Sequence, residues 1–406
     1  MRKLFTLLIM LVIVSKANSQ CTATITASSS TSPFCQGKGV ILAANSNSNW
    51  TQKANLGRGN RNGAVGFSIG SKGYIGTGWI NYCCDTLKND FWEYDPTTNI
   101  WTQKADFAGG SGARGIGFSI SSKGYIVWGK QLWEYNPTTN LWTRKADFGD
   151  AGFLDIGFSI GNKGYVASAF SSKHFWEYNP TTDIWTQKAD FIGETRQGAV
   201  SFSIGSKGYI GTGWNTKYKK DFWEYDPITN VWTQKADFGG VGRFYAVGFS
   251  IGNKGYIGTG RDNYLRNDFW EYVPANDVWI QRASFIGASR TDAVGFSIGN
   301  KGFLGTGGQS SVPGFSDFYE YDPELKYLWS TGDTTSYITV STSGKYSVKI
   351  TNPAKGCSAT SKPKVITFEP SPSATFLQSA CGSYLWNNVK YTNSGTYTQI
   401  FADPRG

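Results

Sequence analysis

One segment of the chain recurs six times, and this repeat constrains the fold more than any other feature. Each copy reads approximately A-V-G-F-S-I-G-S-K-G-Y-I-G-T-G, then a gap of variable length, then F-W-E-Y-D-P-T-T-N-I-W-T-Q-K-A-D-F. The tyrosine of the F-W-E-Y word recurs at intervals of 41, 43, 47, 47 and 49 residues, at Tyr94, Tyr135, Tyr178, Tyr225, Tyr272 and Tyr321. A period in this range, with paired glycines and a tryptophan-ended unit, is typical of repeat proteins with four strands per unit.

Each copy predicts four strands and therefore an all-β fold. In the first copy the strands are Ala64–Ile69, Tyr74–Gly78, the F-W-E-Y word and Ile100–Ala105. The G-S-K-G word predicts a tight hairpin turn in which glycine supplies a positive φ. Asp95–Asn99 predicts the turn before the fourth strand. Aromatic residues make up 16% of the chain, which favours strands.

The ends of the repeat array predict a closed ring. A single four-stranded blade exposes its edges and faces, and six blades around an axis cover them. The first W-T-Q-K-A word, Trp50–Ala54, has no strands of its own before it, whereas the last copy, Ala293–Pro323, lacks this word after it. We therefore expect Trp50–Ala54 to be the fourth strand of the sixth blade.

The repeat resembles kelch-repeat β-propellers over residues 50–323. The matching features are a glycine-rich second strand, a Tyr in the third strand and a Trp seven residues later, as at Tyr94 and Trp101. The usual Gly-Gly at the end of the second strand is replaced by G-T-G in four copies and by Ala167-Ser168-Ala169 in the third. The resemblance implies an all-β, six-bladed kelch propeller spanning residues 49–327.

The flanks of the repeat array predict a second module. Residues 20–48 and 328–370 together resemble one immunoglobulin-like domain of the type repeated in large bacterial cell-surface proteins, with Trp329 in its core. The propeller would be inserted in one of its loops, which is easy if the ends of the ring lie close together. An accidental fusion is the alternative. Residues 371–406 resemble the start of another β repeat, so we expect a fragment that lacks a C-terminal anchoring domain.

The N-terminus predicts export. Arg2 and Lys3 precede the apolar run Leu4–Val14, and Ala17–Ser19 offers small residues for cleavage before Gln20. This pattern is a signal peptide, residues 1–19, too short to span a membrane. No later stretch could cross a bilayer. We expect a secreted or cell-surface protein.

The charge of the chain suggests acidic partners. The formal net charge is +10, and without the signal peptide it is about +7. In an exported protein this favours acidic glycans or a negative cell surface and makes nucleic acid a poor partner. The alternative is that lysines in solvated turns, such as Lys72 and Lys123, supply most of the charge.

Export permits disulfides among the six cysteines. Cys35 precedes the predicted strand Val40–Ala44, and Cys357 follows the strand Tyr346–Asn352. We predict a Cys35–Cys357 disulfide at one end of the immunoglobulin-like module. The remaining cysteines are Cys21, Cys381 and the adjacent pair Cys83 and Cys84, whose state the sequence leaves open.

The residue inventory argues against catalysis by known triads. Galactose oxidase, a copper enzyme with a kelch propeller, needs two histidine ligands, and this chain has only His174. The same shortage argues against Ser-His-Asp and Cys-His catalysis. The repeated Glu of the F-W-E-Y word is identical in every copy, which indicates a structural role. We therefore expect no catalytic residues, no metal, no cofactor and no enzymatic activity.

One face of the ring is predicted to bind the ligand. Loops between the second and third strands, and between blades, vary in length. The loop between the second and third strands is long in the first copy, at Trp79–Asp90, and short in the second, at Lys130–Gln131. Variable loops on a rigid scaffold are where recognition usually occurs. We name this side the variable-loop face.

Arginine and aromatic residues on this face are the predicted ligand-binding residues. The arginines lie six residues before the Phe of each first strand, where they would line the channel mouth, and are Arg61, Arg196, Arg243 and Arg290. The aromatic residues are Trp79, Trp214, Tyr218, Tyr245 and Tyr264. Arginine pairs with carboxylates, and aromatic rings stack on sugars. Alternatively, the arginines cap strands and bind loop carbonyls.

These observations predict a secreted or cell-surface binding or adhesion protein. Its partner would be an extracellular glycan or protein. The alternative is a carbohydrate-active enzyme of the kelch type, such as a sialic-acid epimerase, in which Glu194 or Asp292 acts beside an arginine.

Overall fold

The computed structural model describes most of the chain between residues 23 and 391. The described ranges are 23–27, 34–35, 39–46, 49–57, 59–80, 86–112, 114–149, 156–167, 172–309, 314–353, 356–369, 384–386 and 389–391. The predicted signal peptide, residues 1–19, and Cys21, Cys83, Cys84 and Cys381 lie outside these ranges, as does most of the C-terminal repeat. Among the described residues, no helix is long and apolar enough to span a membrane.

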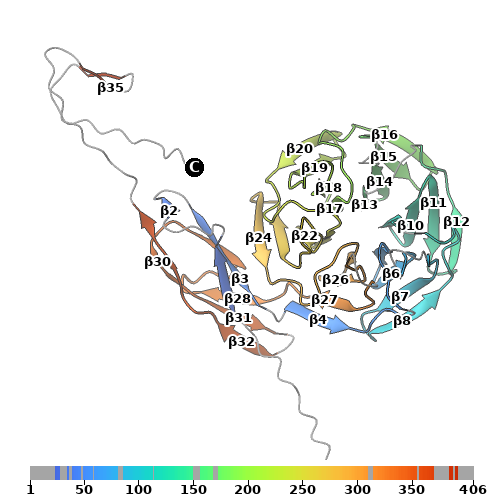
Figure 1. Cartoon of the computed structure of the whole chain (residues 1–406), viewed down its shortest axis with the longest axis horizontal. Helices are drawn as coiled ribbons and strands as arrows, with labels where there is room; N and C mark the ends of the chain where they lie inside the picture. The colour runs from blue at the N-terminus through green and yellow to red at the C-terminus, as the bar shows by residue number, and fades with distance from the viewer. Residues whose placement is uncertain are drawn as a thin grey trace, which may run out of the picture.

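Most of this part of the chain forms six four-stranded antiparallel sheets arranged in a ring, which fits a β-propeller (Figure 1). The first strands of the blades, which contact one another between blades, are β5 (Val65–Ile69), β9 (Ile116–Ile120), β13 (Ile156–Ile160), β17 (Val200–Ile204), β21 (Val247–Ile251) and β25 (Val294–Ile298). The second strands are β6 (Lys72–Gly76), β10 (Lys123–Trp128), β14 (Lys163–Ala167), β18 (Lys207–Gly211), β22 (Lys254–Gly258) and β26 (Lys301–Gly305). The third strands are β7 (Phe91–Asp95), β11 (Gln131–Asn136), β15 (Phe175–Asn179), β19 (Phe222–Asp226), β23 (Phe269–Val273) and β27 (Phe318–Tyr321). The fourth strands are β8 (Ile100–Lys104), β12 (Leu141–Arg144), β16 (Ile184–Lys188), β20 (Val231–Lys235), β24 (Val278–Arg282) and β4 (Trp50–Lys53).

The predicted ring closure is confirmed. β4 pairs antiparallel with β27, so that Trp50 lies opposite Tyr321 and Lys53 opposite Phe318. The Trp50 side chain is buried and packs edge-on against Phe269 of the fifth blade. The first strand of the array therefore completes the last sheet, and both ends of the ring are held in one blade.

The first hairpin of each blade is shorter than predicted. In the first blade, Ile69 pairs with Lys72, which leaves only Gly70 and Ser71 in the turn. Gly70 has a φ of 58°, as the sequence predicts. The second strand therefore begins two residues earlier than expected, and it ends at Gly76. Thr77 has a φ of 61°, a left-handed conformation that cannot continue a strand.

The core of the ring lies between adjacent blades. Each blade inserts the Phe of its first strand against a glycine of the next blade. In the first blade, a Cβ added to Gly73 would lie 2.5 Å from the Phe296 ring, and the same close approach recurs between Gly255 and Phe202. The glycine of the K-G-Y word is therefore required for packing between blades.

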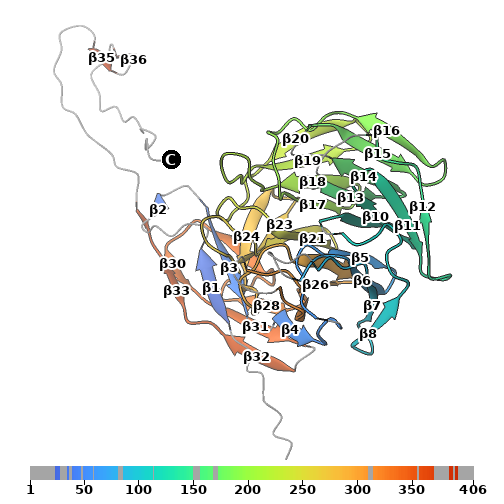
Figure 2. The same cartoon turned by 45° about the vertical axis from the view of Figure 1, so that its right-hand side comes forward.

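The two flanks join in a small β-sandwich beside the ring (Figures 1 and 2). One sheet contains β1 (Thr24–Ala27), β3 (Val40–Asn45) and β29 (Tyr337–Val340); the other contains β28 (Lys326–Trp329), β31 (Val348–Asn352) and β32 (Cys357–Thr360). Two-stranded pairs add β30 (Gly344–Tyr346) with β33 (Lys364–Ile366), β2 (Phe34–Cys35) with β34 (Phe368–Glu369), and β35 (Tyr384–Trp386) with β36 (Val389–Tyr391). Trp329 is buried in the sandwich core, as predicted.

The predicted Cys35–Cys357 disulfide does not fit the register of these strands. Cys357 is disulfide-bonded, and its backbone lies opposite Asn352. The Cys35 backbone lies beside Glu369, near the Gly344 end of the β30–β33 pair. Gly344 and Asn352 are separated by roughly 25 Å of strand, whereas bridged Cα atoms lie within about 7 Å. The register therefore does not support the predicted pairing, which stays a prediction.

The sandwich packs on the fifth blade through β24. This strand reads V-W-I-Q-R, where β8 and β16 read I-W-T-Q-K. Arg282 donates hydrogen bonds to the carbonyl oxygens of Ala44 (3.3 Å) and Ser336 (3.2 Å), one from each flank. Among the fourth strands, β24 alone has Ile280 and Arg282 at these positions, and its blade is the one that the sandwich covers.

Candidate functional site

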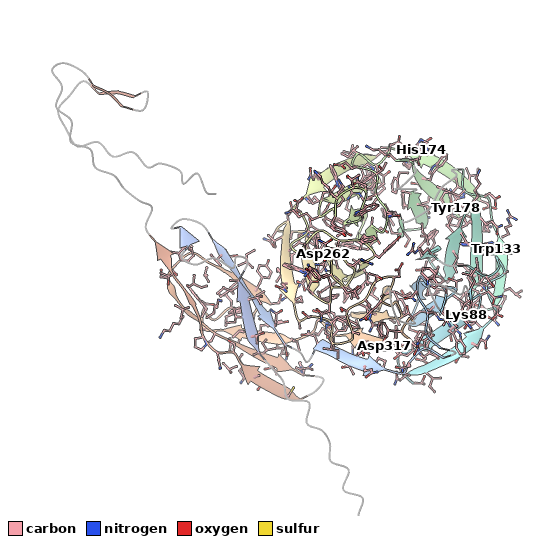
Figure 3. All side chains as sticks on the ribbon, in the orientation of Figure 1. Lys88, Trp133, His174, Tyr178, Asp262 and Asp317 are labelled. Atoms are coloured by element: carbon pink, nitrogen blue, oxygen red, sulfur yellow. The ribbon has the colours of Figure 1, made fainter. Side chains whose placement is uncertain are left out.

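The four repeat arginines are buried, which corrects their predicted exposure at the ligand site. Arg61, Arg196, Arg243 and Arg290 each have 0% exposure. Each forms a two-pronged ion pair, with N–O distances of 2.5–3.0 Å, to an aspartate of its own blade, namely Asp90, Asp221, Asp268 or Asp317. Figure 3 labels Asp317, which immediately precedes β27. A buried guanidinium requires such a partner, so these side chains are not available to an external ligand.

The arginines stabilise the loops of the variable-loop face. Arg243 illustrates the pattern: it donates to the carbonyl oxygens of Thr259 and Val241, both at 3.0 Å. Burial acts to raise the pKa of Asp268, but Arg243 holds it below its ordinary value. The aspartate also accepts the indole N–H of Trp270 at 2.7 Å. This is the loop-supporting alternative that the sequence left open.

The sequence carried a signal for this pairing that we did not use. An Asp precedes the third strand only in the four blades that have the Arg, at Asp90, Asp221, Asp268 and Asp317. The second and third blades have Gln131 and His174 at this position, and they have glycine at the arginine position. Arg and Asp are therefore present together or absent together, as expected for a buried pair.

Three of the five predicted loop aromatics cluster around one phenylalanine. Trp214, Tyr218 and Tyr245 surround Phe244, with ring centroids at 6.3, 5.9 and 4.6 Å, although Phe244 was absent from the prediction. Trp79 and Tyr245 both contact the Arg114 guanidinium, whose carbon lies 5.1 and 4.2 Å from their ring centres. Tyr264 is 71% exposed and has Arg266 over its ring. The fold thus brings together three of the five predicted aromatics.

A ring of backbone at the start of the first strands defines the centre of this face. The residues four positions before the first-strand Phe all have a φ between 52° and 63°, and in the described blades they are Gly63, Arg114, Gly198, Tyr245 and Asp292. Their backbones are linked by hydrogen bonds of 2.8–3.3 Å from Arg114 to Gly63, from Gly63 to Asp292, from Asp292 to Tyr245 and from Tyr245 to Gly198. We call these five residues the mouth ring.

Three of the mouth-ring residues carry side chains that meet. The Arg114 Nε lies 3.2 Å from the Asp292 Oδ1, and the Arg114 guanidinium carbon lies 4.2 Å from the centre of the Tyr245 ring. The Asp292 side chain is only 10% exposed. Burial raises the pKa of Asp292 above its ordinary value, although Arg114 opposes this shift. The sequence predicts roles for Tyr245 and Asp292, and only the structure connects them with Arg114.

A pocket of about 210 Å³ opens beside Asp292. Its lining residues are Asn62, Gln197, Phe244, Tyr245, Arg261, Thr291, Asp292, Gly308 and Gln309, which come from four different blades. We call it the loop-face pocket. Amide, hydroxyl, carboxyl and guanidinium groups converge there with two aromatic rings, which is the composition of a site for a small polar molecule.

The other acidic candidate, Glu194, lies elsewhere. Its side chain is 69% exposed and pairs with Lys219. Asn215 also donates a hydrogen bond to the Glu194 carboxylate at 3.0 Å. Hydrogen bonds from Lys219 and Asn215 hold the pKa of Glu194 below its ordinary value. Of the two acidic residues in the enzyme alternative, Asp292 lines the pocket.

Comparison with known proteins supports the fold. No protein-family model matches the chain, and no curated protein matches it. Among solved structures, the chain is similar to the structure of YjhT, with a TM-score of 0.53 and 14% sequence identity. The alignment covers 66% of this chain and 96% of YjhT. At this identity the likeness shows the fold alone.

The expectation that the chain is not an enzyme is not upheld by the comparison with YjhT, although the comparison assigns no activity. A shortage of histidine therefore does not exclude catalysis on such a ring, because acid–base work can also be carried by carboxyl groups and tyrosines.

Proposed function

We propose that the chain is a secreted or cell-surface protein that binds a carbohydrate in the loop-face pocket. The proposal treats the ring as a six-bladed kelch-type propeller and the joined flanks as an immunoglobulin-like module. The repeat pattern and the similarity to YjhT support the first assignment. The signal-peptide pattern of residues 1–19 supports export.

The observation that carries the proposal is the lining of the pocket. Asn62, Gln197 and Gln309 supply amide donors and acceptors, and Thr291 supplies a hydroxyl. Phe244 and Tyr245 supply aromatic faces on which a sugar ring can stack. The volume of about 210 Å³ suits one small sugar unit better than an extended chain, since sites for drug-sized ligands begin at about 300 Å³.

The test is binding to a panel of neutral and carboxylated monosaccharides and disaccharides, measured by calorimetry. We expect the wild type to bind at least one sugar and Gln197→Ala to weaken that binding by about tenfold, as the loss of one hydrogen bond worth about 1.4 kcal/mol implies. Thr181→Ala, in an exposed turn on the opposite face, is the matched control. Absence of sugar binding, or unchanged binding by the Gln197 variant, would contradict the proposal.

A carbohydrate-active enzyme is the second candidate, and Asp292 favours it. A buried carboxyl with a raised pKa can retain its proton at a higher pH than an ordinary aspartate, as a general acid requires. Conversion of N-acetylneuraminate anomers, followed by NMR, tests this function. Turnover should be lost in Asp292→Asn, which keeps the side-chain shape but cannot donate the carboxyl proton. Absence of wild-type turnover would remove this substrate from consideration.

A further inference from the structure

The Arg114 guanidinium occupies a cage made by three other blades. Its carbon lies 5.1 Å from the centre of the Trp79 ring and 4.2 Å from the centre of the Tyr245 ring. The Asp292 carboxylate completes the cage at 3.2 Å from Nε. Two aromatic faces and a carboxylate are the groups that bind organic cations in proteins.

The backbone conformation of the cage is costly. Arg114, Tyr245 and Asp292 have φ values of 56°, 52° and 54°. A residue with a Cβ loses about 1–2 kcal/mol in this left-handed region, and glycine does not. Gly63 and Gly198 occupy the equivalent positions of the first and fourth blades. Glycine would adopt this conformation without strain, so the side chains of Arg114 and Tyr245 are placed there at an energetic cost, and that of Asp292 at a smaller one.

The cage walls are held independently of the Arg114 side chain. The Asp292 N–H donates to the Tyr245 carbonyl oxygen at 3.3 Å, and the Tyr245 N–H donates to Gly198 at 2.8 Å. The Arg114 side chain is 37% exposed, whereas that of Asp292 is 10% exposed. The Arg114 side chain is therefore open to solvent, whereas the Asp292 carboxylate that binds it is part of the buried wall of the cage. An external cation can reach the position of Arg114 once that side chain swings out.

We propose that Trp79, Tyr245 and Asp292 form a binding site for the guanidinium group of an external ligand, and that Arg114 closes this site in cis. The ligand group would be a planar cation that contacts two aromatic rings and pairs with a carboxylate, as the Arg114 guanidinium does in the structure. Its source is a free small molecule or an arginine side chain of a polypeptide. This site goes beyond carbohydrate binding, because its ligand is a cation and its walls include Trp79.

Occupation of the site by Arg114 lowers the affinity of the wild type for an external guanidinium. An external guanidinium must replace one that is tethered at the site, so its apparent affinity falls by the fraction of time the cage is open. Arg114→Gly removes the occupant and suits the φ of 56°, as Gly63 does in the first blade. This variant should therefore retain the fold and open the site.

Calorimetry on the full chain tests the proposal with two probes, free L-arginine and N-acetyl-L-arginine amide. Arg114→Gly should bind at least one probe about tenfold more tightly than the wild type does. Binding of free arginine alone indicates a small-molecule ligand, and binding of the blocked form indicates a polypeptide ligand. Arg114→Gln serves as a second opened variant, with a shorter and uncharged side chain.

Two controls make the result decisive. Adding Asp292→Asn to Arg114→Gly should abolish probe binding, and N-acetyl-L-lysine amide should bind more weakly than its arginine counterpart. The proposal is overturned if neither opened variant binds either arginine probe at millimolar concentration, or if the Asp292→Asn change leaves binding intact. Sugar binding by these variants reports on the loop-face pocket and has a different probe, so the two proposals can fail separately.

Discussion

Arg282→Ala should detach the sandwich from the ring and destabilise the protein. Arg282 donates to both carboxylate oxygens of Glu271, at 3.0 and 2.8 Å, and it bridges to Ala44 and Ser336 in the flanks. Both members of the pair are buried. The variant removes the contacts to the sandwich and leaves a buried carboxylate without its main partner.

The expected loss of unfolding free energy is about 3 kcal/mol. Breaking one side of a buried ion pair costs about 3–5 kcal/mol, because an uncompensated charge remains. The lower end applies here, since Lys254 still lies 2.7 Å from Glu271. Lys104→Ala is the matched control, because Lys104 occupies the same strand position in the first blade. Its 3.3 Å pair with Glu93 is more exposed and should contribute less than about 1 kcal/mol.

Urea denaturation at neutral pH measures the difference, and hydrogen exchange locates it. Exchange should increase first in β3 and β29, the strands joined to the ring through Arg282. Equal losses for the Arg282 and Lys104 variants would refute the reasoning. Unchanged exchange in β3 and β29 would show that other contacts hold the sandwich in place.

Three further predictions concern pH and glycine positions. Burial acts to raise the pKa of Glu271, but Arg282 and Lys254 hold it at about 2, below its ordinary value of 4.5. Its contribution is therefore complete above about pH 4.5 and is lost as the pH falls towards 2, so the acid loss of stability should be smaller in Glu271→Gln than in the wild type by a difference on the order of 3 kcal/mol. Ser121, with a φ of 53°, occupies the turn position of Gly205, so Ser121→Gly should raise the unfolding free energy by about 1 kcal/mol and Gly205→Ser should lower it similarly. Gly73→Ala should cost about 1–3 kcal/mol by urea denaturation, because its Cβ would lie 2.5 Å from the Phe296 ring; a neutral result would mean that the Phe296 ring can shift aside and that this glycine is not required for packing.

The sequence alone determined the architecture, because the repeat records the same physical requirements six times. Alternating apolar residues, turn glycines and Trp-ended units specify a four-stranded sheet. The unmatched Trp50–Ala54 word specifies how the ring closes. The last copy lacks a fourth strand and would leave an unpaired sheet edge, and pairing Trp50–Ala54 with that edge removes it. Local hydrogen-bond patterns set these features, and they can be read without three-dimensional coordinates.

Only the tertiary structure decided which residues form the site. Arg196 and Arg114 are both arginines in the loops before a first strand, yet Arg196 is buried against Asp221 and Arg114 crosses the face to Asp292. Sequence spacing cannot tell a buried arginine from one that crosses the face. The partner of Arg114 lies 178 residues away and belongs to a blade that meets it only in the closed ring. The left-handed backbone of Tyr245 and Asp292 is indicated in the sequence only by Gly63 and Gly198 at the equivalent repeat positions. Closure of the ring brings the described loops of five blades together at the mouth ring, and contacts made there depend on the closed geometry of the ring.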